Sequence, residues 1–394
     1  MKIAHLISTF LPSKGGAEIC VHNIASEQTK KGHTVKVIAP KKSAPLPLSY
    51  EVIHLKPRSV FLSAFPFIRN IYFVRQLERI QRLHQFDIWQ VTIGYPFGVA
   101  AIDFFRKNKI PCVLRCSGED IQTEPEIKYG IRLRRWPNFL IRRYYPQFNG
   151  HISIIDSITR DYLSIGVSNE KIFYIPNGVN KGFFGAAADR DTSRKRLGID
   201  AFKKVILTVG RNHSKKGFDK IPYIIKSLSK KRDDFVWLLI GRGNEKIARM
   251  ARKEGVGRFL VVKESLTDGG TESRRDFPSR ELVDIYKAAD LFVLPTLIEG
   301  CSTVITEAMA AGLPIISTDV DGVRDMVTHN DTGLLCGKHD FEGMAENISA
   351  IMDDRGLYKR IKRNVLAKTE GLDWSNVADK YLNVYEEIIR REKG

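Results

Sequence analysis

Two glutamates, Glu299 and Glu307, stand on either side of a predicted helix start in the second half of the chain. A strand precedes them, Ser302 or Thr303 can cap the helix, and Gly312 follows its last turn. The unpaired backbone N–H groups of such a helix start suit a diphosphate. Because carboxylates accept hydrogen bonds from sugar or ribose diols, both glutamates are candidates for one ligand. The alternative for Glu307 is a solvated helix residue.

A short basic segment follows another predicted strand, Val205–Val209. It holds Arg211 and Lys216, in the kind of loop at a strand's carboxyl end where open α/β sheets bind ligands. Two cations there would stabilise a leaving diphosphate as its negative charge grows. Taken alone, the segment is equally compatible with a solvated basic loop.

Two adjacent glycines, Gly15 and Gly16, separate the first predicted strand from the first predicted helix, Glu18–Lys31. Glycines let the backbone approach a ligand closely, although a plain tight turn has the same composition. The spacing differs from G-x-G-x-x-G, so this loop does not indicate a nicotinamide site.

Predicted strands alternate with helices along the whole chain, which indicates an α/β protein with parallel sheets covered on both faces. The predicted strands are Lys2–Ile7, Thr34–Ala39, Glu51–Leu55, Asp87–Ile93, Pro111–Cys116 and His151–Ile155, then Val205–Val209, Phe235–Ile240, Phe259–Val262, Leu291–Leu294 and Pro314–Ser317. The Pro-, Asn- and Gly-containing segment Ile175–Asn180 predicts a hinge between the two series. With 394 residues, we expect two domains. The first spans 1–177 and is completed by a helix over 374–394, and the second spans 178–373. A polar segment, Thr267–Arg280, predicts an exposed loop.

The composition, 43% hydrophobic and 27% charged, is typical of a soluble globular protein. No apolar run is long enough for a transmembrane helix, and the N-terminus lacks the features of a signal peptide. The five cysteines are odd in number and widely spaced, which argues against a disulfide framework. Cys112 and Cys116 lack the second pair that a zinc site needs, so we expect buried thiols.

With these segments taken together, the chain resembles the retaining glycosyltransferases of the GT-B fold, and in particular family four, the group 1 glycosyl transferases. The resemblance covers most of the chain and rests on four segments, which are Gly15-Gly16-Ala17-Glu18, Ile175-Pro176-Asn177-Gly178-Val179, Gly210-Arg211 with Lys216-Gly217, and Glu299-Gly300 through Glu307 to Gly312-Leu313-Pro314. It implies two Rossmann-like domains that face each other across a donor-binding cleft, with the acceptor in the first domain and the donor in the second.

The resemblance also implies roles for the matching residues. Arg211 and Lys216 would hold the diphosphate of a nucleoside-diphosphate sugar, Glu307 would bind the ribose hydroxyls, and Glu299 would contact the transferred sugar. The rest of the phosphate and sugar site would come from the backbone of Gly300, Cys301, Ser302, Thr303 and Val304, and from the loop of Gly15 and Gly16. We expect a UDP-sugar donor, retention of anomeric configuration, and neither a cofactor nor a metal. The two cations can replace Mg²⁺ in neutralising charge. Base recognition is expected near Val262 and after Ile240.

One segment departs from the family pattern. The family often has a histidine in a His-Gly-x-Asp-like segment of the first domain, whereas this chain reads Ser117-Gly118-Glu119-Asp120. A serine can hydrogen-bond a sugar hydroxyl, but it cannot shuttle a proton near pH 7 as a histidine does. Ser117 and Asp120 are therefore candidate site residues, and the leaving phosphate is a candidate acceptor for the proton.

The net charge of +18 favours an anionic partner, such as nucleic acid, a membrane surface or a phosphorylated substrate. Two stretches of the first domain, Ile127–Ile155 and Val52–Leu77, contain no acidic residue. The first interleaves arginines with Trp136, Phe139 and tyrosines, and the second includes the apolar run Val60–Ile68. These stretches suit an anionic bilayer, and an ordinary core helix with a solvated basic face is the alternative. We expect a cytoplasmic protein with peripheral contact to the inner membrane.

Two other functions compete with sugar transfer to a saccharide or lipid-linked acceptor in cell-surface polysaccharide or glycolipid synthesis. A nucleic-acid-binding protein would explain the charge, but carboxylates such as Glu299 and Glu307 repel phosphate backbones, so we expect no nucleic-acid partner. A GT-B enzyme of another class, a nucleotide-sugar epimerase or a phosphorylase, would share much of the site. Sugar interconversion without acceptor-dependent nucleotide release would favour that class.

Overall fold

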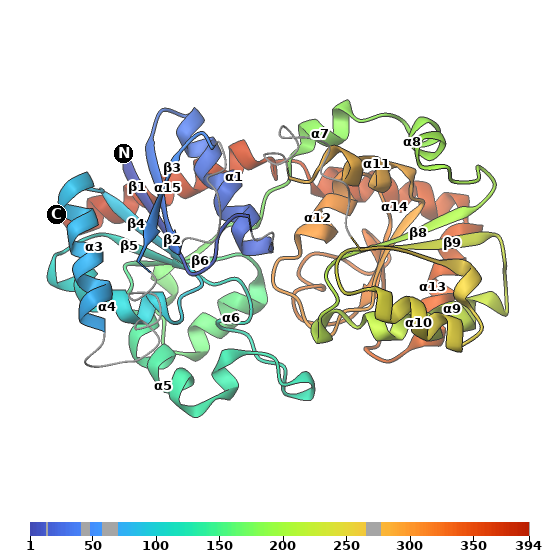
Figure 1. The fold of residues 1–394 in the computed structure, drawn as a ribbon, viewed down its shortest axis with the longest axis horizontal. Helices are drawn as coiled ribbons and strands as arrows, with labels where there is room; N and C mark the ends of the chain where they lie inside the picture. The colour runs from blue at the N-terminus through green and yellow to red at the C-terminus, as the bar shows by residue number, and fades with distance from the viewer. Residues whose placement is uncertain (13–14, 41–47, 57–69, 265–276, 394) are drawn as a thin grey trace. The chain divides into compact units, whose positions relative to one another are not determined.

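The computed structural model describes residues 1–12, 15–40, 48–56, 70–264 and 277–393. The chain divides into two compact units. Unit 1 comprises Met1–Gly178 with Trp374–Gly394, and unit 2 comprises Val179–Asp373. Each unit contains one parallel sheet with helices on both of its faces (Figure 1). Most of the predicted loop, residues 267–276, and the apolar run 60–68 lie outside the described residues.

The sheet of unit 1 has seven parallel strands in the order β3-β2-β1-β4-β5-β6-β7. The strands are β1 (Lys2–Ile7), β2 (Thr34–Pro40), β3 (Glu51–Leu55), β4 (Ile88–Thr92), β5 (Cys112–Arg115), β6 (Gly150–Ser153) and β7 (Ile172–Tyr174). Apolar residues fill the central strands because helices cover both faces. The sequence did not indicate β7, an edge strand of three partly exposed residues.

The helices of unit 1 connect these strands. They are α1 (Gly16–Lys30), α3 (Asn70–His84), α4 (Phe97–Lys107), α5 (Arg135–Tyr144), α6 (Asp156–Ser164) and α15 (Trp374–Lys393). Among the described residues of this unit, four single-turn 3₁₀ helices lie between them, at Pro125–Ile127, Ile131–Leu133, Tyr145–Gln147 and Asn169–Lys171. The C-terminal helix α15 packs against α1, so the end of the chain belongs to the first unit (Figure 1).

Unit 2 has six parallel strands in the order β10-β9-β8-β11-β12-β13. The strands are β8 (Lys204–Val209), β9 (Phe235–Ile240), β10 (Leu260–Lys263), β11 (Leu291–Leu294), β12 (Ile315–Thr318) and β13 (Gly333–Cys336). The α-helices are α7 (Lys181–Ala186), α8 (Arg190–Leu197), α9 (Ile221–Ser229), α10 (Glu245–Lys253), α11 (Arg280–Ala288), α12 (Thr303–Ala310), α13 (Phe341–Asp353) and α14 (Arg355–Lys368). In the part of unit 2 that the structure describes, three single-turn 3₁₀ helices span Ser214–Lys216, Phe218–Lys220 and Gly257–Phe259. The edge strand β13 was not indicated by the sequence.

Both sheets reverse their strand order at one place. In unit 1, β1 lies between β2 and β4, and in unit 2, β8 lies between β9 and β11. Open parallel sheets bind ligands at such switch points, outside the carboxyl ends of the two strands. Arg211 and Lys216 follow β8, and Glu299 follows β11. The topology alone therefore indicates that the loops with the predicted site residues lie at the ligand-binding edge of the unit 2 sheet.

No helix in the described ranges is both long and apolar enough to cross a membrane. Within those ranges, no cluster of three or more His, Cys, Asp or Glu side chains could hold a metal ion. Cys112 and Cys116 are both buried thiols outside any disulfide. Burial raises the pKa of Cys112 to about 12.

Candidate active site

A buried ion pair joins the loops after β8 and β11. The Lys216 Nζ atom donates a hydrogen bond of 2.6 Å to Glu299 Oε1, and Lys215 Nζ lies 3.6 Å from Glu299 Oε2. The Thr296 hydroxyl oxygen also lies 3.0 Å from Glu299 Oε1. Glu299 is only 3% exposed. Its carboxylate is thus fixed between two ammonium groups, one of which, that of Lys215, the sequence did not single out.

The backbone holds the two loops in this register. The Leu297 N–H group and the Thr296 hydroxyl both donate to the Lys215 carbonyl oxygen, at 2.7 Å each. Gly217 has φ +62°, and a Cβ atom there would overlap the carbonyl oxygen of Pro295. Only glycine fits both the left-handed conformation and this close approach. Gly217 therefore allows the lysines to meet Glu299.

At this pair, burial and the charge of the partner shift each pKa in opposite directions. Burial lowers the pKa of Lys216 although Glu299 stabilises its charged form, and the nearby charges of Lys215 and Arg211 lower it further. Burial acts to raise the pKa of Glu299, but Lys216 and Lys215 together with its hydrogen bonds leave that pKa below its usual value. Two ammonium groups thus face one carboxylate, and the charge of Arg211 acts on Lys216 as well, so the loop retains a positive field. Arg211 itself is exposed.

Helix α12 begins beside this pair. Ser302 occupies its N-cap position, but its side chain does not cap the helix as the sequence suggested. The Ser302 hydroxyl is buried without a hydrogen-bond partner in the described structure. The first-turn N–H groups of an α-helix have no intrahelical acceptor. Gly300 and Cys301 are buried, whereas Thr303 and Val304 are half-buried. This helix start is therefore a set of donors suited to an anion.

Glu307 lies inside α12 and is 9% exposed, so it is not a solvated helix residue. The Tyr286 hydroxyl of α11 donates to Glu307 Oε2 at 2.9 Å. Burial raises the pKa of Glu307 to about 7, and the Tyr286 hydrogen bond only partly offsets that effect. The sequence placed Tyr286 on a core face of its helix and did not identify it as a partner of Glu307.

A third loop, after β9, lies against the loop after β8. A Cβ atom on Gly241, whose φ is +132°, would overlap the carbonyl oxygen of Gly210. Glu264, which follows β10, accepts hydrogen bonds of 2.6 Å from the N–H groups of Gly243 and Glu245. These bonds hold the pKa of Glu264 below its usual value. The expected base-binding region, near Val262 and after Ile240, is thus structured by a carboxylate that the sequence did not point to.

In unit 1, Asp120 supports a loop with its carboxylate. Its Oδ1 atom accepts from the N–H groups of Ser117 and Gly118 at 2.9 and 3.1 Å, and its Oδ2 atom accepts from the Gly94 N–H group at 3.1 Å. Asp120 is 4% exposed. These contacts favour a role in shaping the loop over the predicted catalytic role. Ser117 remains a candidate, because it is only partly buried.

The two glycines after β1 differ in their surroundings. A Cβ atom on Gly15 would overlap the Glu18 carboxylate, which also accepts a hydrogen bond of 2.5 Å from the Thr9 hydroxyl. Gly16 begins α1, and no described atom lies within 4 Å of a Cβ built there. Gly15 has an ordinary extended φ of −122°. Close packing against Glu18 therefore accounts for the glycine at position 15, whereas a Cβ atom at position 16 would meet no described atom.

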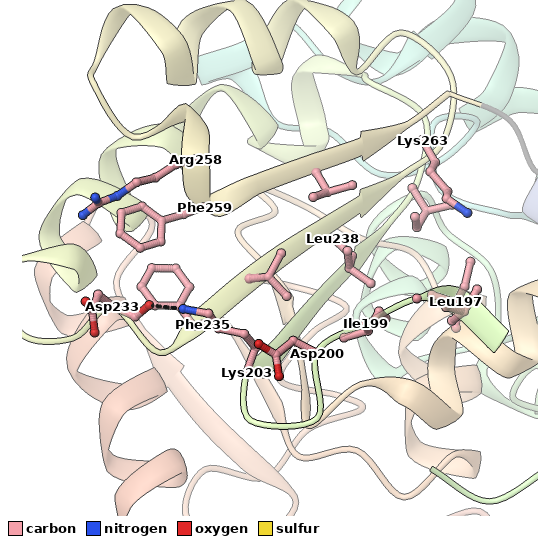
Figure 2. A pocket seen from close by; sticks show the side chains of 15 residues that line it. Leu197, Ile199, Asp200, Lys203, Asp233, Phe235, Leu238, Arg258, Phe259 and Lys263 are labelled. Atoms are coloured by element: carbon pink, nitrogen blue, oxygen red, sulfur yellow. Dashed lines mark hydrogen bonds between the residues drawn. The ribbon is translucent and has the colours of Figure 1, made fainter. Parts of the chain in front are cut away.

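A cavity of about 520 Å³ lies on the face of the unit 2 sheet formed by β9 and β10. Figure 2 shows its mostly apolar lining, which includes Phe235, Leu238 and Phe259 with Arg258 and Lys263 at its ends. It contains none of the lysines and glutamates that meet at the switch point. We therefore place the candidate site at the loops and not in this cavity.

Comparison with known families matches both units. Residues 14–183 match the family described as Glycosyltransferase Family 4, and residues 203–354 match the family described as Glycosyl transferases group 1. The lipopolysaccharide core biosynthesis mannosyltransferase LpsB of Rhizobium meliloti is 29% identical over 260 residues, which are 65% of this chain and 69% of LpsB. D-inositol 3-phosphate glycosyltransferase 1 of Catenulispora acidiphila is 29% identical over 242 residues, or 58% of this chain and 54% of that protein. The chain thus spans little more than half the length of some relatives.

Solved structures resemble the chain over nearly its full length. The sucrose-phosphate synthase of Thermosynechococcus elongatus has a TM-score of 0.79 at 18% identity and covers 99% of this chain and 100% of its own. The Anabaena protein Alr3699/HepE, in complex with UDP, has a TM-score of 0.76 at 18% identity and covers 98% and 100%. These likenesses establish the predicted GT-B fold. The two family matches, which together cover most of the chain, show that it belongs to the group 1 glycosyltransferases.

Proposed function

We propose that this chain transfers a sugar from a nucleoside-diphosphate sugar, with UDP favoured, to a saccharide or lipid-linked acceptor. The observation that carries the proposal is the buried contact between Lys216 and Glu299 beside the start of α12. Cations, helix N–H groups and a carboxylate lie at one switch point. This arrangement fits a ligand that combines a diphosphate with hydroxyl groups.

The diphosphate would lie between the basic loop and α12. An ammonium group has three N–H donors, and Lys216 uses one of them on Glu299 in the described structure. Arg211 is exposed and close enough to perturb Lys216 electrostatically. The unpaired Ser302 hydroxyl adds a neutral donor at the helix start. As the bond to the sugar breaks, these groups stabilise the charge that accumulates on the leaving diphosphate without requiring a metal.

The carboxylates of Glu307 and Glu299 would accept hydrogen bonds from the hydroxyl groups of the ligand. Glu307 uses one oxygen on Tyr286, and its other oxygen has no hydrogen-bond partner in the described ranges, which suits the ribose hydroxyls. Glu299 Oε2 would accept from a hydroxyl of the transferred sugar while Oε1 remains with Lys216. The Asp120 carboxylate already accepts from three backbone N–H groups, so we do not assign it as the base that takes the acceptor proton. We infer that the leaving phosphate takes this proton and that the anomeric configuration is retained.

The relatives support the choice of donor and acceptor class. Alr3699/HepE is described in complexes with UDP and with UDP-glucose. LpsB is named a mannosyltransferase of lipopolysaccharide core biosynthesis, and a neighbour of known structure, WaaG, is described as involved in lipopolysaccharide biosynthesis. From these names we infer that the acceptor belongs to a cell-surface polysaccharide or glycolipid.

Transfer can be tested with UDP-glucose, UDP-galactose and GDP-mannose, each offered with lipopolysaccharide core oligosaccharides in the presence of EDTA. We expect one donor to release nucleoside diphosphate only when acceptor is present, and proton NMR to show the donor's anomeric configuration in the product. Glu299→Gln should abolish release, whereas Glu254→Gln, at a surface ion pair with Lys226, is the matched control. Sugar interconversion without transfer would instead indicate an epimerase.

We also propose that unit 1 docks on an anionic membrane through α5. Trp136 and Phe139 are 47% and 53% exposed, and their rings stack with centroids 5.6 Å apart. The exposed basic residues of this segment are Arg134, Arg135, Arg142 and Arg143. Exposed aromatic rings among arginines suit the interface of an anionic bilayer.

Vesicle sedimentation tests this surface directly. Vesicles with 30% phosphatidylglycerol should bind the protein, and purely zwitterionic vesicles should bind it much less, because each arginine near an anionic surface contributes about 1 kcal/mol. The double variant Trp136→Ala, Phe139→Ala should lose most binding. The control is Phe202→Ala, which removes an aromatic side chain that is 91% exposed in unit 2. Equal losses in both variants would contradict docking through α5.

A further inference from the structure

We propose that Arg115 is a positioning residue that fixes the Ser117 hydroxyl as a hydrogen-bond donor to an oxygen atom of the sugar substrate. The inference rests on the proposed function and adds a residue of unit 1 to it. It depends on three observations, which are the burial and contacts of Arg115, the single hydrogen bond of the Ser117 hydroxyl, and the place of this loop in the sheet.

Arg115 is the last residue of β5 and is 1% exposed. Its Nε atom donates to the Tyr381 hydroxyl of α15 at 3.0 Å, and its Nη2 atom donates to Asn177 Oδ1 at 2.6 Å. These contacts from two other elements fix the plane of the guanidinium group. Its remaining terminal nitrogen, Nη1, donates to Ser117 Oγ at 2.8 Å. The direction of this last donor is therefore set by the core of unit 1.

A serine hydroxyl has one proton to donate and lone pairs that accept. Because Arg115 donates to the Ser117 oxygen, the proton of that hydroxyl must point elsewhere. No described residue accepts it, and the only other hydrogen bond of Ser117 is from its backbone N–H group to Asp120 Oδ1. Since the side chain is only partly buried, the proton is available to a ligand. Donation from a guanidinium group also polarises the hydroxyl and strengthens it as a donor.

The loop lies where the fold places ligands. β5 is next to β4, which forms the switch point of unit 1 with β1. Directly after β4, Ile93 has φ +64°, and its N–H group donates to the Arg115 carbonyl oxygen at 3.1 Å. A β-branched residue in this conformation is strained, and such strain concentrates at binding sites. The ligand atom must be a hydrogen-bond acceptor, and a hydroxyl or ring oxygen of the sugar fits this requirement.

Kinetics of Ser117→Ala, Arg115→Met and the double variant test the pairing, with the wild-type transfer assay as reference. We expect Ser117→Ala to lower kcat/KM by about tenfold, which is the loss of one hydrogen bond to substrate. Ser117→Thr, which keeps the hydroxyl, should restore most of it. Arg115→Met should cost activity in the wild-type background but little more in the Ser117→Ala background, because the two act through one group. Ser164→Ala, at an exposed serine of the same unit, is the control.

Separate readouts distinguish the outcomes. Thermal unfolding corrects for any loss of fold in Arg115→Met, and the affinity for UDP should be unchanged in all variants if the donor site of unit 2 is intact. Multiplicative losses in the double variant, or an unaffected Ser117→Ala, would overturn the pairing while leaving the proposed function in place. A wild-type chain that binds no nucleotide sugar and transfers none would overturn the proposed function and this inference together.

Discussion

The buried carboxyl of Glu307 makes the stability of unit 2 depend on pH in a specific way. Burial raises its pKa from 4.5 to about 7 in the folded chain. In the unfolded chain the carboxyl titrates near its ordinary value. Between these two pKa values the folded chain therefore holds one proton that the unfolded chain has lost, so stability falls as pH rises across this interval. Above about pH 7 the contribution is constant.

The size of the effect follows from the interval between the two pKa values. One pH unit corresponds to about 1.4 kcal/mol, so the interval corresponds to about 3 kcal/mol for this carboxyl. Glu307→Gln removes the ionisation, keeps the shape, and lets the side chain still accept the Tyr286 hydroxyl. We expect the variant to be more stable than wild type at pH 8 by up to about 3 kcal/mol and to differ little at pH 4.5.

Urea unfolding of both proteins, followed by tryptophan fluorescence, to which the buried Trp237 of unit 2 contributes, measures the difference. The matched variant is Tyr286→Phe, which removes the only hydrogen bond that lowers the pKa of Glu307 and should steepen the pH dependence. The same carboxylate must accept ribose hydroxyls, so Glu307→Gln should also weaken UDP binding while it stabilises the fold. Parallel stability curves for wild type and Glu307→Gln between pH 4.5 and 8 would refute the reasoning.

Three further results are expected. Lys216→Ala should destabilise unit 2 by about 3 kcal/mol in urea unfolding, because it leaves the buried Glu299 carboxylate without its closest cation. Lys215→Ala should destabilise it less, because the Lys215 ammonium lies 3.6 Å from that carboxylate. A larger loss of stability in Lys215→Ala than in Lys216→Ala would contradict the geometry. Gly217→Ala should lower the melting temperature and abolish UDP binding, since a Cβ atom there overlaps Pro295; a variant that binds UDP normally would show that the loop is not needed. UDP-glucose affinity should rise about tenfold between pH 6 and pH 8 as Glu307 ionises, measured by calorimetry; a flat profile would argue against a role for its charged form.

The sequence was most informative where strands are covered on both faces. Val205–Val209 and Phe235–Ile240 are continuous apolar runs, and the structure has strands over nearly the same residues. The two strands that the sequence did not indicate, β7 and β13, are the outer edges of their sheets. Each is short and partly exposed, so neither carries the apolar pattern of a central strand.

The candidate site was predictable as a set of loops but not as a network. Lys216 and Glu299 lie 83 positions apart, and the switch-point topology is what brings them together. Local patterns could not show that Tyr286 of α11 would hydrogen-bond Glu307 of α12, because the two residues come from separate helices. Ser117 is only two residues from Arg115, but the contacts with Tyr381 and Asn177 that orient Arg115 come from distant parts of the chain. The contacts of Asp120 were likewise not predictable from its own segment, because one of the three N–H groups that it accepts from, that of Gly94, comes from another loop.

The central claim is that the loops after β8 and β11 bind the diphosphate of a nucleotide sugar. A thermal-shift titration with UDP, GDP, ADP and their sugars, run on wild type and Lys216→Ala, tests it most directly. We predict that one nucleotide raises the melting temperature of wild type in a concentration-dependent manner, by mass action, and that Lys216→Ala loses this response. If no nucleotide shifts the wild-type melting temperature, or if Lys216→Ala responds as wild type does, the site lies elsewhere.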